Sequence, residues 1–288
     1  MGEQQSRALL SLLIDALQSG RLAVMTAQAS ASQTARQRVR AELTREIKHE
    51  ARRQLASHGA EGLSLRAVAR ELGMVSSALY RYFPSRDDLL TALIIDAYDA
   101  LGEAAEASAA AASADAAGGR GRWRALCAAI RGWALAHPHE YALIYGSPVP
   151  GYQAPQATIA SAVRVVRVLG GVLAGVEPGA SAGAGAAAGA GAAAGAGAAA
   201  GAGAAAGDLP PGGAPPLPEV LARQTAIVAD AIAPGTPGPV IARGLIAWTQ
   251  LFGLISFELF GQLVGALDPA DAFFGYAVEQ MAGFIGLP

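Results

Sequence analysis

The side chains best suited to chemistry gather in one short segment of the first third of the chain. The polar ones are Ser76, Ser77, Tyr80 and Arg81. Val75, Leu79 and Phe83 recur every four residues through this segment, so on a helix they would face the core and leave the polar side chains outside. Hydroxyl groups and a guanidinium on the outer face of a short helix are groups that hydrogen-bond base edges and phosphates. The segment therefore predicts a helix over residues 76–83 whose exposed polar face needs a functional explanation.

The neighbouring residues supply the elements that position this helix. Ser64 can cap an earlier helix, and Gly73 ends that helix because glycine accepts the positive φ of a tight turn. Pro84 stops the second helix, and Ser85 with Asp88 forms a capping box that starts the next one. Two short helices joined by a glycine turn, the second polar and basic, describe a helix-turn-helix, whose second helix fits the major groove of DNA.

Residues 62–73 (GLSLRAVARELG) and 78–90 (ALYRYFPSRDDLL) resemble the DNA-binding domain of TetR-type transcriptional regulators. The resemblance covers about residues 44–101, with the helix before Ser64 as the first of the domain. It implies an all-α fold, in which a three-helix helix-turn-helix DNA-binding domain is followed by a helical ligand-binding and dimerisation domain. It also implies a homodimeric repressor that binds a palindromic operator and is released by a small molecule.

The resemblance also implies which residues contact DNA. Those implied to meet the DNA backbone or the groove edge are Ser64, Arg66, Tyr82 and Arg86. Those implied to lie in the major groove are Ser76, Ser77 and Tyr80. Arg81 is implied to reach either a base or a phosphate.

The charge distribution independently favours a polyanionic partner for the first third of the chain. The formal net charge is −2, but residues 1–86 hold 13 basic and 7 acidic side chains, whereas residues 87–288 hold 8 basic and 16 acidic ones. A basic domain attached to an acidic one is typical of proteins that bind phosphate groups at one end. The alternative is ordinary variation of surface charge.

Elsewhere the apolar residues recur with the period of a helix. Further helices are expected over residues 122–136, 158–174, 218–232, 241–263 and 270–285. The segment 177–217 breaks this pattern, because it consists largely of Ala and Gly followed by a proline-rich stretch and has too few large side chains to form a core. The expected organisation is a flexible or partly helical extension over 1–37, the DNA-binding domain over 38–86, and a regulatory domain over 87–288 that contains a disordered insertion over 177–217.

The aromatic residues of the regulatory domain have two interpretations. Those at issue are Trp133, Tyr141, Tyr145, Trp248 and Phe252. Each alone is best explained as part of the core, but as a group they predict an apolar pocket in which hydroxyl and indole N–H groups orient a ligand. The long apolar helices over residues 240–286 contain glycines that permit close helix approach, so they predict the homodimer interface.

Several classes of protein find no support in the sequence. No cofactor motif and no catalytic constellation is found, so an enzyme is not expected. Cys127 is the one cysteine, and His137 and His139 are the only histidines close together, so no metal site is expected. No run of about 18 charge-free apolar residues is present, so we expect a cytoplasmic protein without a membrane span. Residues 1–24 match nothing in the resemblance, and Met25 is an alternative start.

The sequence therefore predicts a DNA-binding transcriptional regulator of the TetR type. Its expected partners are double-stranded DNA with a palindromic operator, a small and largely apolar effector, and a second copy of the chain. The alternative is a helical adaptor that binds other proteins without specific DNA binding. No cofactor is expected in either case.

Overall fold

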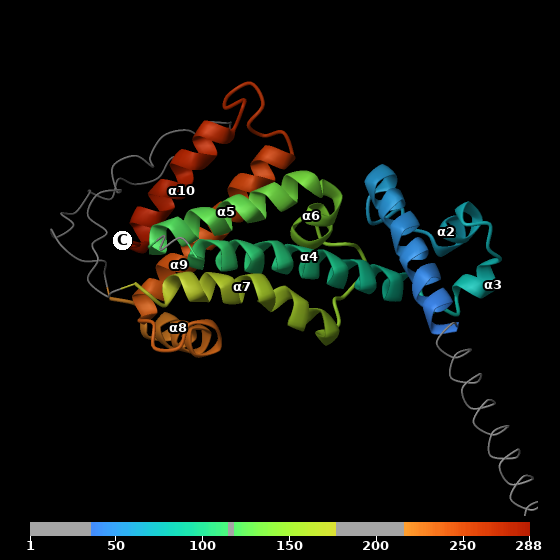
Figure 1. The fold of residues 1–288 in the computed structure, drawn as a ribbon, viewed down its shortest axis with the longest axis horizontal. Helices are drawn as coiled ribbons and strands as arrows, with labels where there is room; N and C mark the ends of the chain where they lie inside the picture. Colours follow the sequence, from blue (N-terminus) through green and yellow to red (C-terminus); the bar gives the residue numbers. More distant parts are fainter. Residues whose placement is uncertain (1–35, 115–117, 177–215) are drawn as a thin grey trace, which may run out of the picture. The chain divides into compact units, whose positions relative to one another are not determined.

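The computed structural model describes residues 36–114, 118–176 and 216–288, and these residues form helices, turns and loops without any strand. The all-α prediction is confirmed. The predicted extension over residues 1–37 and the insertion over 177–217 lie almost wholly outside the described residues. The chain divides into two compact units between Leu89 and Leu90, within helix α4 (Arg86–Ala114) (Figure 1).

The first unit contains a helix over residues 36–58, α2 (Leu65–Glu71), α3 (Ser76–Leu79) and the start of α4. The first of these helices ends before Gly59, which adopts a φ of +69°. Its buried face, led by Ile47 and Leu55, belongs with Val68 and Leu79 to the unit's apolar core. Burial of these side chains stabilises α2 and α3, because helices as short as these two are not stable alone.

The predicted turns and caps of this unit are confirmed. The Ser64 hydroxyl accepts a hydrogen bond from the Ala67 backbone N–H, as a helix cap does. Gly73 has a φ of +65°, the left-handed conformation that the turn between α2 and α3 requires. The Ser85 hydroxyl accepts from the Asp88 backbone N–H at 3.1 Å and donates to the Asp88 carboxylate at 2.6 Å.

Two expectations for α3 are wrong. The helix ends at Leu79 instead of residue 83, and turns follow it. Leu79 and Phe83 are buried as predicted, but Val75 is 70% exposed. Val75 precedes the helix with extended backbone angles (φ −69°, ψ 136°), so the spacing of four residues that a continuous helix would give does not apply to it.

The second unit is a bundle formed by the rest of α4 and the helices that follow it (Figure 1). These are α5 (Gly119–Ala136), α6 (Pro138–Tyr145), a short 3₁₀ helix (Gln156–Thr158), α7 (Ile159–Leu173), α8 (Glu219–Ile232), α9 (Gly238–Leu259) and α10 (Asp271–Ile285). Helix α5 packs against α7, α9 and α10, and α9 also packs against α8 and α10. Among the described helices of this unit, the sequence pattern missed α6 and the short 3₁₀ helix, and it placed the end of α9 four residues too late.

Polar side chains join the helices of the bundle at a few points. The buried indole N–H of Trp123 donates to the carbonyl oxygen of Val278 at 3.0 Å. The Arg131 guanidinium pairs with Glu258 through both carboxylate oxygens and with Asp271 at 2.9 Å. These contacts tie α5 to α9 and to both the start and the middle of α10.

Two helices of the described residues are long and apolar enough to cross a membrane when judged by length and composition alone: the segment 156–173 and α9. Core helices of water-soluble bundles pass the same test, so this finding is weak evidence for a membrane span. Both helices also contain an arginine that this chain itself engages. Arg164 pairs with Asp99 and Glu106 on α4, and Arg243 donates to the carbonyl oxygen of Ile285.

Candidate nucleic-acid interface

Helix α3 and the turn after it present the side chains that the sequence assigned to the major groove. Ser77 and Arg81 are exposed, Tyr80 is 41% exposed, and Ser76 is half-buried. Leu79, the buried residue of α3, anchors the helix to the core and leaves these polar groups on the outer side. The structure thus gathers them on one short, solvent-facing element.

The residues assigned to the DNA backbone are more varied in their surroundings. Arg66 is exposed in the first turn of α2, whereas Ser64 is half-buried by its capping role. The Tyr82 ring is half-buried, and the Arg40 guanidinium lies over it, 5.2 Å from the ring centroid. Their contacts with DNA stay predictions.

Arg86 has a structural role that the sequence did not reveal. Its Nη2 donates to the carbonyl oxygen of Ala60 at 2.7 Å, and its Nε donates to that of Leu63 at 3.2 Å. An ion pair with Asp87 at 3.5 Å adds to these bonds, and the side chain is 30% exposed. Arg86 therefore holds the loop that precedes α2. The predicted phosphate contact would use the part of the guanidinium that stays exposed to solvent.

Arg40 is a candidate DNA contact that sequence reasoning missed. Besides stacking on Tyr82, it donates through Nη2 to the Arg81 carbonyl oxygen at 3.4 Å. These contacts place the beginning of the helix over residues 36–58 beside the turn that follows α3. Arg36 and Arg38 are exposed on that same stretch. Their alternation with uncharged residues over 36–40 was the available signal.

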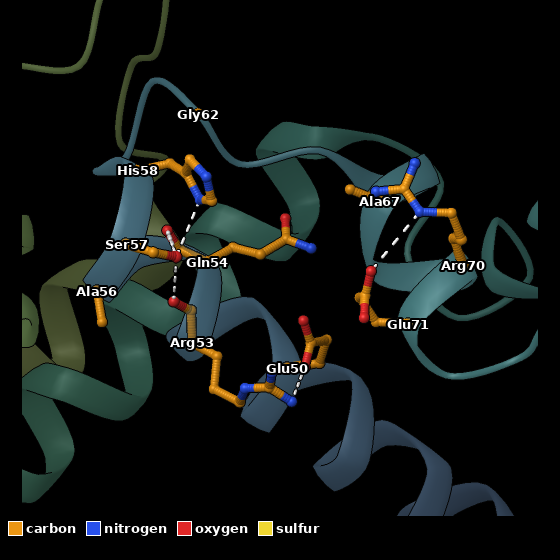
Figure 2. Close-up of a pocket in the computed structure, with 10 residues that line it drawn as sticks. All are labelled: Glu50, Arg53, Gln54, Ala56, Ser57, His58, Gly62, Ala67, Arg70 and Glu71. Atoms are coloured by element: carbon orange, nitrogen blue, oxygen red, sulfur yellow. Dashed lines mark hydrogen bonds and ion pairs between the residues drawn. The ribbon is translucent and has the colours of Figure 1, made fainter.

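A pocket of about 560 Å³ opens between the helix over residues 36–58 and α2 (Figure 2). Its charged lining residues are Glu50, Arg53, Arg70 and Glu71. Buried Glu50 pairs with Arg53 at 2.8 Å, and Gln54 accepts from the Ser64 backbone N–H at 3.3 Å. Acidic and basic groups offset each other here, so this pocket does not select a phosphate. Its contacts instead fix the start of α2.

In the second unit, the structure brings together four of the five aromatic residues assigned to a ligand pocket. The Tyr145 and Phe252 rings lie 4.2 Å apart between centroids. Tyr141, on α6 like Tyr145, and Trp248, on α9 like Phe252, also pack on the Phe252 ring. The Tyr141 hydroxyl donates a hydrogen bond to the Phe252 carbonyl oxygen at 3.0 Å and is hydrogen-bonded to the Ser256 hydroxyl at 2.8 Å. The cluster is therefore both apolar and hydrogen-bonded.

Burial raises the pKa values of the tyrosines in and beside this cluster. Burial raises the pKa of Tyr145 well above its ordinary value, and neighbouring Tyr98 and Tyr141 raise it further. Burial also raises the pKa of Tyr98, whose ring meets Tyr145 edge-on, and sequence reasoning missed this residue. Trp133 packs instead on His137, and its buried indole N–H has no hydrogen-bond partner within the described residues. No cluster of possible metal ligands is found among the described residues.

Two known protein families match this chain, one over the helix-turn-helix and the other over the helical bundle. Residues 47–93 match a family described as "Bacterial regulatory proteins, tetR family". Residues 123–281 match a family described as "Tetracyclin repressor-like, C-terminal domain". The two matches cover the helix-turn-helix and most of the helical bundle.

Individual relatives were also found. The HTH-type transcriptional regulator Rv1816 of Mycobacterium tuberculosis is 51% identical over 120 residues, which is 40% of this chain and 49% of that protein. Mb1846 of Mycobacterium bovis, also an HTH-type transcriptional regulator, matches equally. The alignment thus spans about half the length of these curated relatives.

Two solved structures share the fold. The crystal structure of SCO4313, assigned as a regulatory protein, has a TM-score of 0.61 and 30% identity, and the alignment covers 86% of this chain and 98% of that one. A protein of unknown function from Rhodococcus sp. RHA1 has a TM-score of 0.53 and 23% identity, with 85% of this chain and 95% of that one covered. The second likeness shows the fold alone.

Proposed function

Because this chain belongs to the TetR family of helix-turn-helix transcriptional regulators, we propose that it is a repressor that binds a palindromic operator as a homodimer and is released by a small, largely apolar effector. The family is not enzymatic, which agrees with the expectation from the sequence. The observation that best supports specific DNA binding is the outward placement of Ser77 and Tyr80 beside buried Leu79 on α3.

In this proposal, one group of residues recognises the bases and a second group binds the phosphates. Ser76, Ser77 and Tyr80 hydrogen-bond base edges and set the sequence preference. The residues that hold the phosphates are Ser64, Arg66, Tyr82 and Arg86, with Arg81 free to reach a base or a phosphate. The basic balance of residues 1–86 supports this assignment, because phosphate contacts supply most of the non-specific affinity.

We place the homodimer interface within residues 240–286, on the outer faces of α9 and α10. Large apolar side chains are exposed along these helices and just after α9: Ile246, Phe257, Phe260, Tyr276 and Phe284. This number of exposed large apolar side chains on two helices that pack together supports an interaction surface there. A side chain added at Gly253 or Gly275 would meet no other atom of the described chain, so a second copy can approach closely there. Two helices from each copy would form a four-helix interface.

We place the effector beside the aromatic cluster of Tyr141, Tyr145, Trp248 and Phe252. Trp133 packs on His137 and not on these rings, and its buried indole N–H, unpaired among the described residues, would be a second anchor for an acceptor on the ligand. Helix α4 runs from the DNA-binding unit into the bundle, where Arg164 ties it to α7. An effector that favours one position of α4 would alter operator affinity to the extent that its own affinity differs between the two states. The site of action is the cytoplasm, where bacterial DNA lies.

The test is selection of operator sequences from a pool of random DNA duplexes with the full chain, followed by titration of the selected duplex. We expect a near-palindrome whose half-site centres lie about one helical turn apart or somewhat further, bound by two chains. Affinity for the operator should exceed that for random DNA by at least about 10³-fold at physiological salt. DNA binding without sequence preference, or no retention on DNA even at low salt, would favour the alternative of a helical protein-binding adaptor.

A further inference from the structure

Val75 occupies a position where its side chain serves neither the core nor the helix. It is 70% exposed, and it is the residue that immediately precedes α3. Serine, threonine, aspartate or asparagine at this position would accept a hydrogen bond from the helix, but valine has no acceptor and makes no such bond. An exposed valine at this point therefore contributes little to folding.

The outer surface of α3 lacks the side chains that recognise purines. Bidentate recognition of guanine uses Arg or Lys, and that of adenine uses Asn or Gln. The segment from Val75 to Tyr80 contains none of these residue types, and the nearest one, Arg81, lies in the turn after α3 at the opposite end from Val75. It offers methyl groups from Val75, hydroxyl groups from Ser76 and Ser77, and a phenol instead. Of the base edges in the major groove, the one that apolar groups recognise is the C5-methyl group of thymine.

We propose that Val75 is a specificity-determining residue that packs its methyl groups against the C5-methyl group of a thymine in each operator half-site. This inference rests on the proposed function, since it requires α3 to lie in the major groove. Residues at the amino end of a recognition helix are the ones that contact base edges, and Val75 stands at that end. The contact removes two apolar surfaces from water, and the serine hydroxyl groups next to it bond the polar edges of adjacent bases.

The test compares thymidine with deoxyuridine, which differs only by the absence of the C5-methyl group. The operator is first selected with the full chain, and its thymines are then replaced one position at a time, symmetrically in both half-sites. At one position the parent protein should lose about fourfold in affinity per half-site, the effect of one buried methyl group. The Val75→Ala variant should bind the thymine operator less tightly by a similar factor and should no longer distinguish thymine from deoxyuridine at that position.

Two further variants separate this contact from a structural role. Val75→Ser removes the methyl groups but restores a helix cap, so it should lose the discrimination while its melting temperature stays the same or rises. Val39→Ala shortens another valine of the same unit, one that is 60% exposed and lies outside α3. This matched control should keep the parent's discrimination.

The outcomes that overturn the inference are distinct. If Val75→Ala weakens binding to both operators equally and keeps the parent's preference for thymine, Val75 does not contact the methyl group. If the parent tolerates deoxyuridine at every position, no thymine methyl is recognised, although operator binding itself stands. If selection yields no preferred sequence, the proposed function fails and the inference fails with it.

Discussion

The guanidinium of Arg86 donates a hydrogen bond of 2.7 Å to the backbone carbonyl oxygen of Ala60, across 26 residues of sequence. Together with the bond to Leu63, it joins the first residue of α4 to the loop that precedes α2. An arginine that the family resemblance assigns to phosphate binding thus also organises the helix-turn-helix. This double role changes what its replacement should do.

We expect Arg86→Ala to destabilise the protein as well as weaken DNA binding. Loss of hydrogen bonds to a charged group that is only partly exposed should lower the free energy of unfolding by about 1–3 kcal/mol. Thermal unfolding of the full chain, monitored by circular dichroism, measures this effect. An unchanged melting temperature would show that solvent replaces these bonds without cost.

Arg66→Ala is the cleaner test of a phosphate contact, because Arg66 is exposed. It should weaken binding to the operator and to random DNA by the same factor, and it should lower the slope of log affinity against log salt by about one unit. Its melting temperature should match that of the parent. Loss restricted to the operator would instead assign Arg66 to base recognition.

Ser77→Ala and Tyr80→Ala should affect sequence recognition selectively. Each should cost roughly 1–3 kcal/mol on the selected operator and little on random DNA, because base contacts supply discrimination between sequences. Both residues are exposed, so folding should be preserved. If both variants bind the operator as tightly as the parent while Arg66→Ala weakens binding to every sequence, α3 is only a non-specific DNA contact.

If α9 forms the proposed homodimer interface, Gly253→Arg should make the protein a monomer. The described chain has open space at this position, so the arginine can be accommodated within one copy, but it would separate two copies that meet on α9. Sedimentation at micromolar concentration should show half the parent's mass. Gly132→Arg on α5 is the matched control, because it also has open space and lies outside the proposed interface. A Gly253→Arg variant that stays dimeric would move the interface elsewhere.

Tyr145, which is partly buried, should make the regulatory domain sensitive to alkaline pH. Burial raises the pKa of Tyr145 in the folded state, so above the ordinary tyrosine pKa of about 10 the unfolded chain loses its proton first. The unfolded state then binds fewer protons than the folded one, and stability falls as pH rises. Tyr145→Phe should reduce this loss between pH 10 and 12, measured by denaturant unfolding. Equal pH dependence in parent and variant would contradict the assignment.

Local patterns in the sequence were enough to predict most of the fold. Apolar residues at helical spacing located the helices except α6, and Ser64, Gly73 and Ser85 marked the boundaries around α2, α3 and α4. Such signals work because caps, turns and amphipathic faces involve residues a few positions apart. Helix α6 escaped because it is only 8 residues long, too short for apolar periodicity to stand out, and it begins with Pro138.

By itself, the sequence determined that the chain is all-α and that a helix-turn-helix is followed by an apolar helical domain. Only the tertiary structure decided that Val75 faces solvent, that Arg86 holds the loop at Ala60, and that Arg40 lies over Tyr82. These relations join residues on separate elements or depend on where one element stops. Periodicity records which face of a helix is apolar, but it contains no information on which distant carbonyl oxygen or ring comes within reach once the helices pack.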